Sequence, residues 1–352
     1  MSGARQTPLA RAAWAAGLAF GAAAVLALTI LLLGQEPLNA FEVFLDGALR
    51  WPSGLGASLA RGAILLCYAL GVALSFRAGI INIGAEGQSR IGSAAAVAAT
   101  LGAPGAFFSA HPALGIPLLL FCGAAGGAAW SLIAGLLKRW RNVSEVVSTL
   151  MLNFAAMPLV KFLISRHEWL QGETQFLKRD LPNSLQLRGW GGTEFHAWVW
   201  PVLPLALAAH YFLFHTKSGM QLRALGHNRQ AARACGVRIE KLELSVFALS
   251  GALAGLAGAM SVMAAGVLEA QPPFPDYGYL SISVALIGAL APLWIVPAAF
   301  LFAAMGVGAA AMEESARVPH WVVFILHGLL ILAILVRSST ARAGSIKEEA
   351  RA

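Results

Sequence analysis

The chain has 352 residues, of which 58% are hydrophobic and only 12% are charged, and its formal net charge is +8. The mean hydropathy of +0.70 and several nearly uncharged windows of about 20 residues, the length that a helix needs to cross a bilayer, exclude a soluble globular protein. The basic residues lie mainly at the ends of these windows and in one loop, which is the positive-inside distribution and argues against nucleic acid as a partner. The three cysteines form no CxxC pair, so neither a disulfide framework nor a metal site is predicted.

The apolar windows predict an all-α polytopic membrane protein of about ten transmembrane segments, some of them short or broken. The first window follows Arg5 and Arg11. Because its apolar stretch is longer than that of a secretory signal and no small-residue cleavage site is convincing, we interpret it as an uncleaved helix with a cytoplasmic N-terminus. Glycines spaced as in Gly123 to Gly127 and Gly251 to Gly255 favour close helix packing. The windows cover residues 12–33, 58–76, 80–101, 113–137, 143–165, 196–215, 244–266, 280–312 and 321–336.

The window at residues 280–312 is too long for one straight span and too short for two full ones. Its middle, Gly288 to Trp294, contains Pro292, which turns or breaks a helix. If the chain runs in and back out here, ten segments place the basic C-terminal tail in the cytoplasm, as its charge requires. A single span would give nine segments and an outside tail, and nine remains the competing count.

Loop charges set the orientation of these segments. Lys138 to Arg141 and Lys217 to Lys241 are basic and are predicted to be cytoplasmic, whereas Arg166 to Glu194 balances acids against bases and is predicted to be outside. We therefore expect a single transmembrane domain over residues 1–352, with a cytoplasmic loop at residues 216–242, an extracytoplasmic loop at residues 166–196 and both termini in the cytoplasm.

The segment Phe76 to Gly92 places polar side chains inside an apolar stretch. Burying a carboxylate in hydrocarbon costs at least about 2.5 kcal/mol on insertion scales, so Glu86 must face a partner or a watery cavity. One interpretation is an irregular polar segment that lines a translocation path, with Asn82, Glu86 and Gln88 as candidate residues. The alternative is a Glu86 to Arg90 pair at i, i+4 that only holds two helices together.

A second group of polar residues opens the window at residues 143–165. At helical spacing Glu145, Ser148 or Thr149, and Asn153 share one stripe of an otherwise apolar helix. Glu145 lies near the inner end and is compatible with an interfacial position, whereas Asn153 lies two turns deeper. Ser148 and Asn153 are therefore candidates for the same path, and interhelical hydrogen bonding is the alternative for Asn153.

The run Lys217 to Lys241 carries six Lys/Arg residues against one acid, Glu240. Asn228 is a suitable N-cap and Gly236 a natural C-terminal stop for a short helix that lies between them, parallel to the membrane. This capped helix predicts a docking site for another protein. The alternative is a positive-inside loop that contacts anionic lipid.

Enzymatic chemistry is not indicated. The sequence contains no GxxxxGK phosphate loop and no set of nucleophile, base and metal ligands. Ser250, in the small-residue stretch Leu249 to Ala259, is interpreted as a helix-packing residue. A secondary transporter or channel is a further alternative, but it needs coupling-ion residues and often internal repeats, and Glu86 is the one deep carboxylate of the sequence.

Signature blocks of one membrane-protein family occur in order along the chain: Asn82 to Gln88 (NIGAEGQ), Ser144 to Asn153 (SEVVSTLMLN), Ser218 to Val237 followed by Leu249 to Ala259, and Tyr277 to Pro292. Over roughly residues 55–337 the chain resembles the permease subunits of bacterial ABC importers for simple sugars, branched-chain amino acids and nucleosides. The first two blocks are most similar to the nucleoside-type subgroup. The chain departs from it at Tyr279-Leu280 and His327-Gly328, where relatives often carry a Phe-Asp pair and a glutamine before the glycine.

The resemblance implies a non-catalytic permease subunit of an ATP-driven importer for purine nucleosides, with simple sugars such as ribose as the alternative. It implies no cofactor. The implied partners are an ABC ATPase with two cassettes, a second and different permease, and a lipid-anchored substrate-binding protein, at the bacterial inner membrane. The translocation path is then expected at Asn82, Glu86, Gln88, Ser148 and Asn153. Coupling to the ATPase is expected within residues 216–242, at Arg223, Gly226, Asn228, Arg229, Ala232, Arg233 and Gly236.

Overall fold

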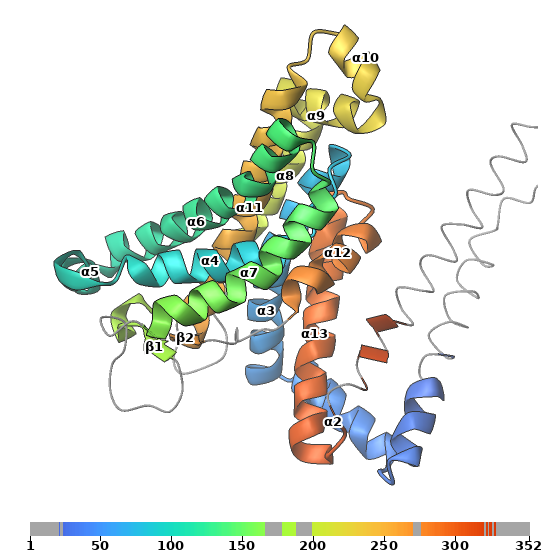
Figure 1. The fold of residues 1–352 in the computed structure, drawn as a ribbon. Coiled ribbons are helices and arrows are strands. Elements are labelled where there is room, and N and C mark those ends of the chain that lie inside the picture. The colour runs from blue at the N-terminus through green and yellow to red at the C-terminus, as the bar shows by residue number, and fades with distance from the viewer. Residues whose placement is uncertain are drawn as a thin grey trace, which may run out of the picture. The chain divides into compact units, whose positions relative to one another are not determined.

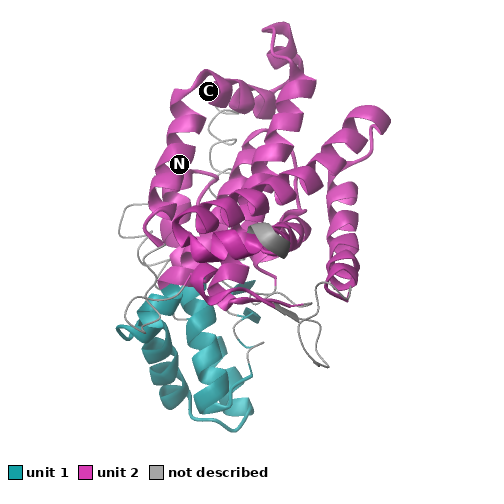
Figure 2. Cartoon of the chain, turned by 90° about the vertical axis from the view of Figure 1, so that its left-hand side faces the viewer, with its two compact units in different colours: residues 1–58, 302–352 teal, residues 59–301 magenta. Residues whose placement is uncertain are grey.

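The computed structural model describes residues 21, 24–165, 178–187, 199–269, 276–319, 322, 324–325 and 327–328. The chain divides into two compact units, one of residues 1–58 with 302–352 and one of residues 59–301 (Figure 2). Almost all of the described structure is helical (Figure 1).

In the unit of residues 1–58 and 302–352, a helix at Ala24–Leu32 is followed by α2 (Pro37–Leu49), and the two are bent by 116°. α2 packs closely on the second half of α13 (Pro292–Ala316), where a Cβ on Gly47 would lie 2.2 Å from the Cβ of Ala311. Glycine is therefore required at this contact. The apolar core of the unit contains Ile30, Ala40, Met305, Ala309, Met312, Ala316, Val318 and Val322.

The unit of residues 59–301 holds most of the described helices. In chain order its helices and strands are most of α3 (Ser53–Arg77), α4 (Ala85–Ala98), α5 (Gly102–Ala110), α6 (Pro112–Arg141), α7 (Glu145–Ser165), β1 (Lys178–Asp180), the 3-10 helix η1 (Asn183–Leu185), α8 (Val202–His215), α9 (Lys217–His227), α10 (Arg229–Ala234), α11 (Ile239–Ala265), β2 (Val267–Glu269), α12 (Tyr277–Ile287) and the first part of α13. Figure 1 shows α9 and α10 at one end of α11, and the two strands at its other end.

The centre of this unit is α11, on which α4 and α6 pack. A Cβ on Gly255 of α11 would lie 2.2 Å from the carbonyl oxygen of Gly123 and 2.8 Å from the Cα of Gly127, both on α6. A Cβ on Gly92 of α4 would lie 2.5 Å from the Cα of Gly255. The three helix backbones therefore meet through small residues, which confirms the close packing predicted for the glycine pairs on α6 and α11.

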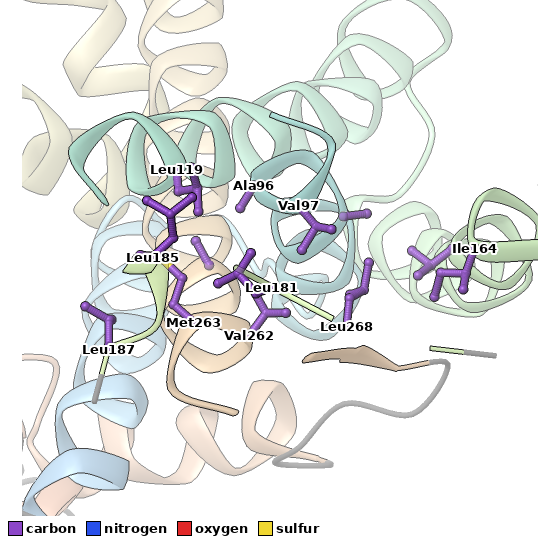
Figure 3. Packing of buried hydrophobic residues seen from close by; sticks show 13 residues of the cluster. Ala96, Val97, Leu119, Ile164, Leu181, Leu185, Leu187, Val262, Met263 and Leu268 are labelled. Atoms are coloured by element: carbon purple, nitrogen blue, oxygen red, sulfur yellow. The ribbon is translucent and has the colours of Figure 1, made fainter. Parts of the chain in front are cut away.

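An apolar cluster fixes the C-terminal end of α4 (Figure 3). Val97 of α4 packs here with Leu119 of α6, Ile164 of α7 and Met263 of α11. Leu185 of η1 is completely buried in the same cluster, next to the antiparallel pair of β1 and β2. β1 and η1 belong to the loop predicted at residues 166–196, and the rest of that loop, residues 166–177 and 188–196, lies outside the described residues.

Helical structure in α4 begins later than its apolar window predicted. The window covered residues 80–101, but the helix starts at Ala85. Gly79 has a φ of +72°, a left-handed conformation that glycine adopts without strain and that ends α3. The chain between Gly79 and Ala85 is not helical, so α4 is a half-length helix that starts inside the unit.

The break predicted between Gly288 and Trp294 is confirmed. α12 ends at Ile287 and α13 begins at Pro292. Ala289 and Leu290 have φ angles of 52° and 54°, a conformation that disfavours side chains with a Cβ. The break is therefore a defined turn between two helices.

Three described helices were not predicted. α2 and α5 lie outside the apolar windows and are too short to span a bilayer, and α9 lies in the run that the sequence presented as a loop with one short helix. The start of α11 is also earlier than expected, at Ile239 instead of residue 244.

The all-α polytopic architecture is confirmed. Within the described residues, five helices are long and apolar enough to cross a membrane, the bent pair at Ala24–Leu32 and α2 makes a sixth candidate, and α8 and α12 are shorter apolar helices. Parts of the predicted first and last windows, residues 12–20, 22–23 and most of 321–336, lie outside the described residues. The total of ten segments, the single-domain organisation and the cytoplasmic termini stay predictions.

We expect Gly255→Ala to destabilise the protein, because the added methyl overlaps α6 and overpacking of this kind costs about 1–3 kcal/mol. Alanine is a better helix former than glycine, so a loss of stability can come only from the contact between α11 and α6. Melting of the detergent-solubilised protein, followed by size-exclusion chromatography, measures it.

The matched control is Gly306→Ala, where a Cβ would have nothing within 4 Å. Equal melting temperatures for the two variants would contradict the packing described for α4, α6 and α11.

Candidate functional site

The non-helical chain between α3 and α4 carries backbone groups that α-helical hydrogen bonding leaves unpaired, and side chains from α7 pair with them. The Ile83 carbonyl accepts a hydrogen bond of 2.9 Å from the amide of Asn153. The Ile83 N–H donates to the hydroxyl of Thr149 at 3.3 Å. A third group, the Gly84 N–H, donates to the side-chain oxygen of Asn82 at 2.9 Å. Polar residues on α7 therefore stabilise the irregular segment.

Asn153 also caps α4 from a different helix. Its side-chain oxygen accepts a hydrogen bond of 2.8 Å from the N–H of Gly87, in the first turn of α4. The N-cap position of α4 is Gly84, which has no side chain to supply this acceptor. The Asn153 amide further donates to the hydroxyl of Tyr279 on α12 at 3.2 Å. One side chain thus joins α7, α4 and α12.

Asn82 and Gln88 connect the same segment to α11. The Gln88 amide donates to the Asn82 side-chain oxygen at 3.0 Å, and the Asn82 amide donates to the hydroxyl of Ser250 at 2.9 Å. Both residues are almost completely buried, with 1% and 2% of their surface exposed. Ser250 therefore does more than the helix packing expected of it, because it accepts a hydrogen bond from the irregular segment.

Glu86 lies where the N-termini of α4 and α12 meet. One carboxylate oxygen accepts a hydrogen bond of 3.0 Å from the N–H of Gly278, in the first turn of α12. The other pairs with Arg90 at 3.1 Å, as the i, i+4 alternative predicted. A Cβ on Gly278 would lie 2.4 Å from the Glu86 nitrogen, so glycine is required for this approach. The positive end of a helix dipole and a guanidinium together stabilise the buried carboxylate.

Four of the five residues predicted for the path are joined in this cluster: Asn82, Glu86, Gln88 and Asn153. Ser148 lies on the same buried face of α7, but its hydroxyl donates to the Glu145 carbonyl of its own helix at 3.2 Å. The sequence analysis expected only helix packing of Ser250, and it did not pair Gly278 or Tyr279 with these residues, because they lie far along the chain. That the cluster lines a path stays a prediction, as does the role of each residue.

The predicted capped helix of the basic run is α10. The Asn228 side-chain oxygen accepts hydrogen bonds from the N–H groups of Gln230 at 2.9 Å and Ala231 at 3.0 Å. Gly236, with a φ of +79°, follows the helix, so the predicted N-cap and stop are confirmed. α9 precedes α10 and is capped by Thr216, whose hydroxyl accepts from the Gly219 N–H at 3.1 Å. We call α9 and α10 together the docking region.

Ion pairs hold α10 against the helices beside it. Arg229 pairs with Glu243 of α11, and Lys138 of α6 lies 3.4 Å from the same carboxylate and 3.2 Å from that of Glu145 on α7. These residues stabilise one arrangement of four helix ends. Arg229, expected as a docking residue, therefore also anchors α10 to its own chain.

Further residues of the docking region differ in their exposure. Arg233 pairs with Glu240 at 3.0 Å on the surface, whereas Ala232 is buried against the apolar core beneath α10. Within the described residues, Arg238 and Lys241 form no ion pair, and they line a cavity of about 340 Å³ beside α9. Both side chains are exposed.

Arg223 and Gly226 of α9 face the end of α3. The Arg223 guanidinium lies 5.1 Å from the ring centroid of Phe214 on α8. Gly226 lies so close to α3 that a Cβ would be 2.1 Å from the carbonyl oxygen of Arg77. Both predicted coupling residues thus contact their own chain, and Gly226 packs directly against the end of a long apolar helix.

Broken helices whose N-termini meet among buried polar side chains are the arrangement by which membrane transporters build sites within the bilayer. This fold is accordingly that of a polytopic membrane transport protein. The chain belongs to the family described as "Branched-chain amino acid transport system / permease component", which matches residues 54–335.

Relatives of the chain carry names of the same class. It is 29% identical over 333 residues to the "Guanosine ABC transporter permease protein NupP" of Bacillus subtilis, covering 90% of each chain. It is 29% identical over 339 residues to the "Glucose ABC transporter permease protein TsgB13" of Haloferax volcanii, covering 91% of this chain and 84% of the relative. The "Nucleoside ABC transporter permease protein NupB" of Lactococcus lactis is 26% identical over 324 residues, covering 88% and 87%.

We expect Asn153→Ala to lower the melting temperature, because it removes the cap of α4 and leaves the part-buried Ile83 carbonyl and the buried Gly87 N–H without their Asn153 partner. An unsatisfied buried group costs about 1–3 kcal/mol. Thermal melting in detergent measures the effect.

Ser148→Ala is the matched control on the same buried face, since its hydroxyl bonds only within α7. A melting temperature for Asn153→Ala as high as that of Ser148→Ala would show that Asn153 is not needed to hold the break.

Proposed function

We propose that this chain is one of two membrane subunits of an ATP-driven importer for purine nucleosides in a bacterial inner membrane. The observation that carries the proposal is the similarity to permeases named for guanosine and for nucleosides along about nine tenths of the chain. Membership of an ABC permease family implies an ATPase partner. The second, different permease and the lipid-anchored binding protein are part of the proposal, as are the cytoplasmic termini.

The substrate path is proposed to pass the cluster where α4 and α12 meet. Amide side chains both donate and accept hydrogen bonds, as do the ribose hydroxyls and the base edge of a nucleoside. Asn82, Gln88 and Asn153 supply three such groups, while Glu86 supplies acceptors and Ser148 a hydroxyl. These groups now bond to one another, so an entering nucleoside would exchange existing hydrogen bonds for new ones.

ATP hydrolysis is proposed to take place on a partner chain that binds the docking region, most directly α10. The basic surface around α9 and α10 favours an acidic groove on that partner. The capped, ion-paired structure of α10 favours protein docking over a flexible lipid-binding loop, since docking needs a fixed shape. The ATPase is proposed to carry two cassettes on one chain.

Import of a simple sugar is the second candidate. It is favoured by one observation, the permease named for glucose, which is as similar to this chain as the guanosine permease. Under this alternative the ATPase docking and the position of the path are unchanged, and only the ligand differs.

Uptake of labelled guanosine and adenosine in cells with and without the chain tests the substrate. We expect uptake to fall on deletion, to return when the chain is supplied again, and to resist competition by unlabelled glucose and ribose. Intact nucleoside uptake with loss of glucose or ribose uptake would replace the nucleoside proposal with the sugar alternative.

Removing the N-cap of α10 tests the docking surface. We expect Asn228→Ala to weaken ATPase binding about fivefold, because loss of an N-cap costs about 1 kcal/mol. The amount of ATPase that copurifies in mild detergent, titrated against ATPase concentration, measures it.

Asn228→Ser is the matched control, since serine caps a helix about as well as asparagine. ATPase binding that is the same for the alanine variant as for the serine variant and the wild type would argue against α10 as the docking element.

A further inference from the structure

The docking region touches the rest of its unit at the end of α3. Gly226, in the last turn of α9, lies against the backbone of residues 77–79: a Cβ there would be 2.1 Å from the Arg77 carbonyl oxygen and 3.1 Å from the Gly79 nitrogen. In return, a Cβ on Gly79 would lie 3.3 Å from the Cα of Gly226. Backbone thus packs on backbone without intervening side chains, so a displacement of α9 must displace the residues that begin the irregular segment before α4.

The side chain of Arg77 connects this contact to the second broken segment. Its Nε donates to the Leu290 carbonyl at 3.0 Å, and a terminal nitrogen donates to the Ala289 carbonyl at 3.0 Å. Ala289 and Leu290 are the residues in the left-handed conformation between α12 and α13. Two charge-assisted hydrogen bonds from one planar guanidinium fix both carbonyls and therefore the direction of α12.

A shared aromatic ring adds a contact between Arg77 and α9. The Arg77 guanidinium lies 5.5 Å from the centroid of Phe214, and the guanidinium of Arg223 on α9 lies 5.1 Å from the same centroid. Phe214 is on α8, directly before α9 in the chain. Arg77 is thus held by cation–π attraction at the base of the docking region while its donors reach the break.

The two broken segments also meet at their far ends, where Glu86 of α4 accepts the N–H of Gly278 of α12. These contacts therefore form a closed loop. One branch runs from α9 through residues 77–79 to the segment before α4. The other runs from Arg77 through the turn at Ala289 and Leu290 to α12. The two branches meet where Glu86 contacts Gly278, beside the proposed substrate path.

We propose that Arg77 is the positioning residue that couples ATPase docking at α9 and α10 to the joint movement of α4 and α12. The inference rests on the proposed function, because it assigns the route by which that importer passes movement to its path. Without the Arg77 side chain, α9 still moves the segment before α4, but α12 no longer follows.

The test is Arg77→Gln in the complete importer, reconstituted with its ATPase, second permease and binding protein, with labelled guanosine as the transported probe. We expect the complex to assemble and to keep ATP hydrolysis in the absence of binding protein. Stimulation of hydrolysis by loaded binding protein is expected to be lost, and the ATP consumed per guanosine transported is expected to rise at least tenfold. Arg77→Lys, which keeps the charge but loses the two-pronged geometry, is expected to recover part of the coupling.

Two further variants separate coupling from folding. Arg139→Gln removes an exposed arginine of α6 that forms no ion pair in the described structure, and it is expected to behave as wild type. If Arg77→Gln alone does not fold, the same change is made together with Ala289→Gly and Leu290→Gly, because glycine adopts the left-handed conformation without strain and makes the turn independent of Arg77.

The inference is overturned if the folded Arg77→Gln complex transports guanosine with the wild-type ratio of ATP to substrate. It is also overturned if hydrolysis and transport fall in proportion, since that result indicates a structural role alone. Failure of the proposed function looks different, because the wild-type chain would then bind no ATPase or move no guanosine at all, and both proposals would be withdrawn.

Discussion

Backbone hydrogen bonding inside the membrane is the constraint on which this structure depends. A chain that leaves the helical conformation at membrane depth must pair its N–H and C=O groups with protein groups or with the water of an internal cavity, because lipid offers no partner. The segment before α4 meets this demand with Asn82, Thr149 and Asn153. The turn after α12 lies next to the docking region, and Arg77 donates to its two carbonyls. Buried amide side chains are accordingly found at the break before α4, and each break is joined to a helix that is distant in sequence.

Under the proposed function, the same residues have two roles. A side chain that completes a break has its bonding groups already satisfied, so it contributes to stability, and only a rearrangement of the break releases it for a ligand. This combination suits a transporter, in which the two half-helices must hold one arrangement at rest and exchange it for another. Arg229 of the docking region also has two roles, since it holds α10 in place and lies on the surface proposed to face a partner.

Much of the architecture could be predicted from the sequence, because it depends on local signals. Apolar length gave the spans, Pro292 and the neighbouring glycine gave the break after α12, and Asn228 with Gly236 gave the bounds of α10. The polar residues of 76–92 indicated an irregular segment, but its bounds were missed, because the sequence does not show that Gly79 adopts the left-handed conformation that ends α3. Asn82, Glu86 and Asn153 could be predicted as site residues because they are polar residues within apolar windows. Their partners Ser250, Gly278 and Tyr279 come from distant parts of the sequence, and only the fold brings them together.

The turn between α12 and α13 has a consequence for how this protein can move. From Tyr277 to Ala316 the two helices and their turn comprise 40 residues. A continuous helix of that length would measure about 60 Å, roughly twice the thickness of the hydrocarbon core. A straight helix would carry about half of this apolar segment out of the hydrocarbon core, so the bilayer favours the kink. Under the proposed function, α12 therefore turns about Ala289 and Leu290 when the path opens or closes.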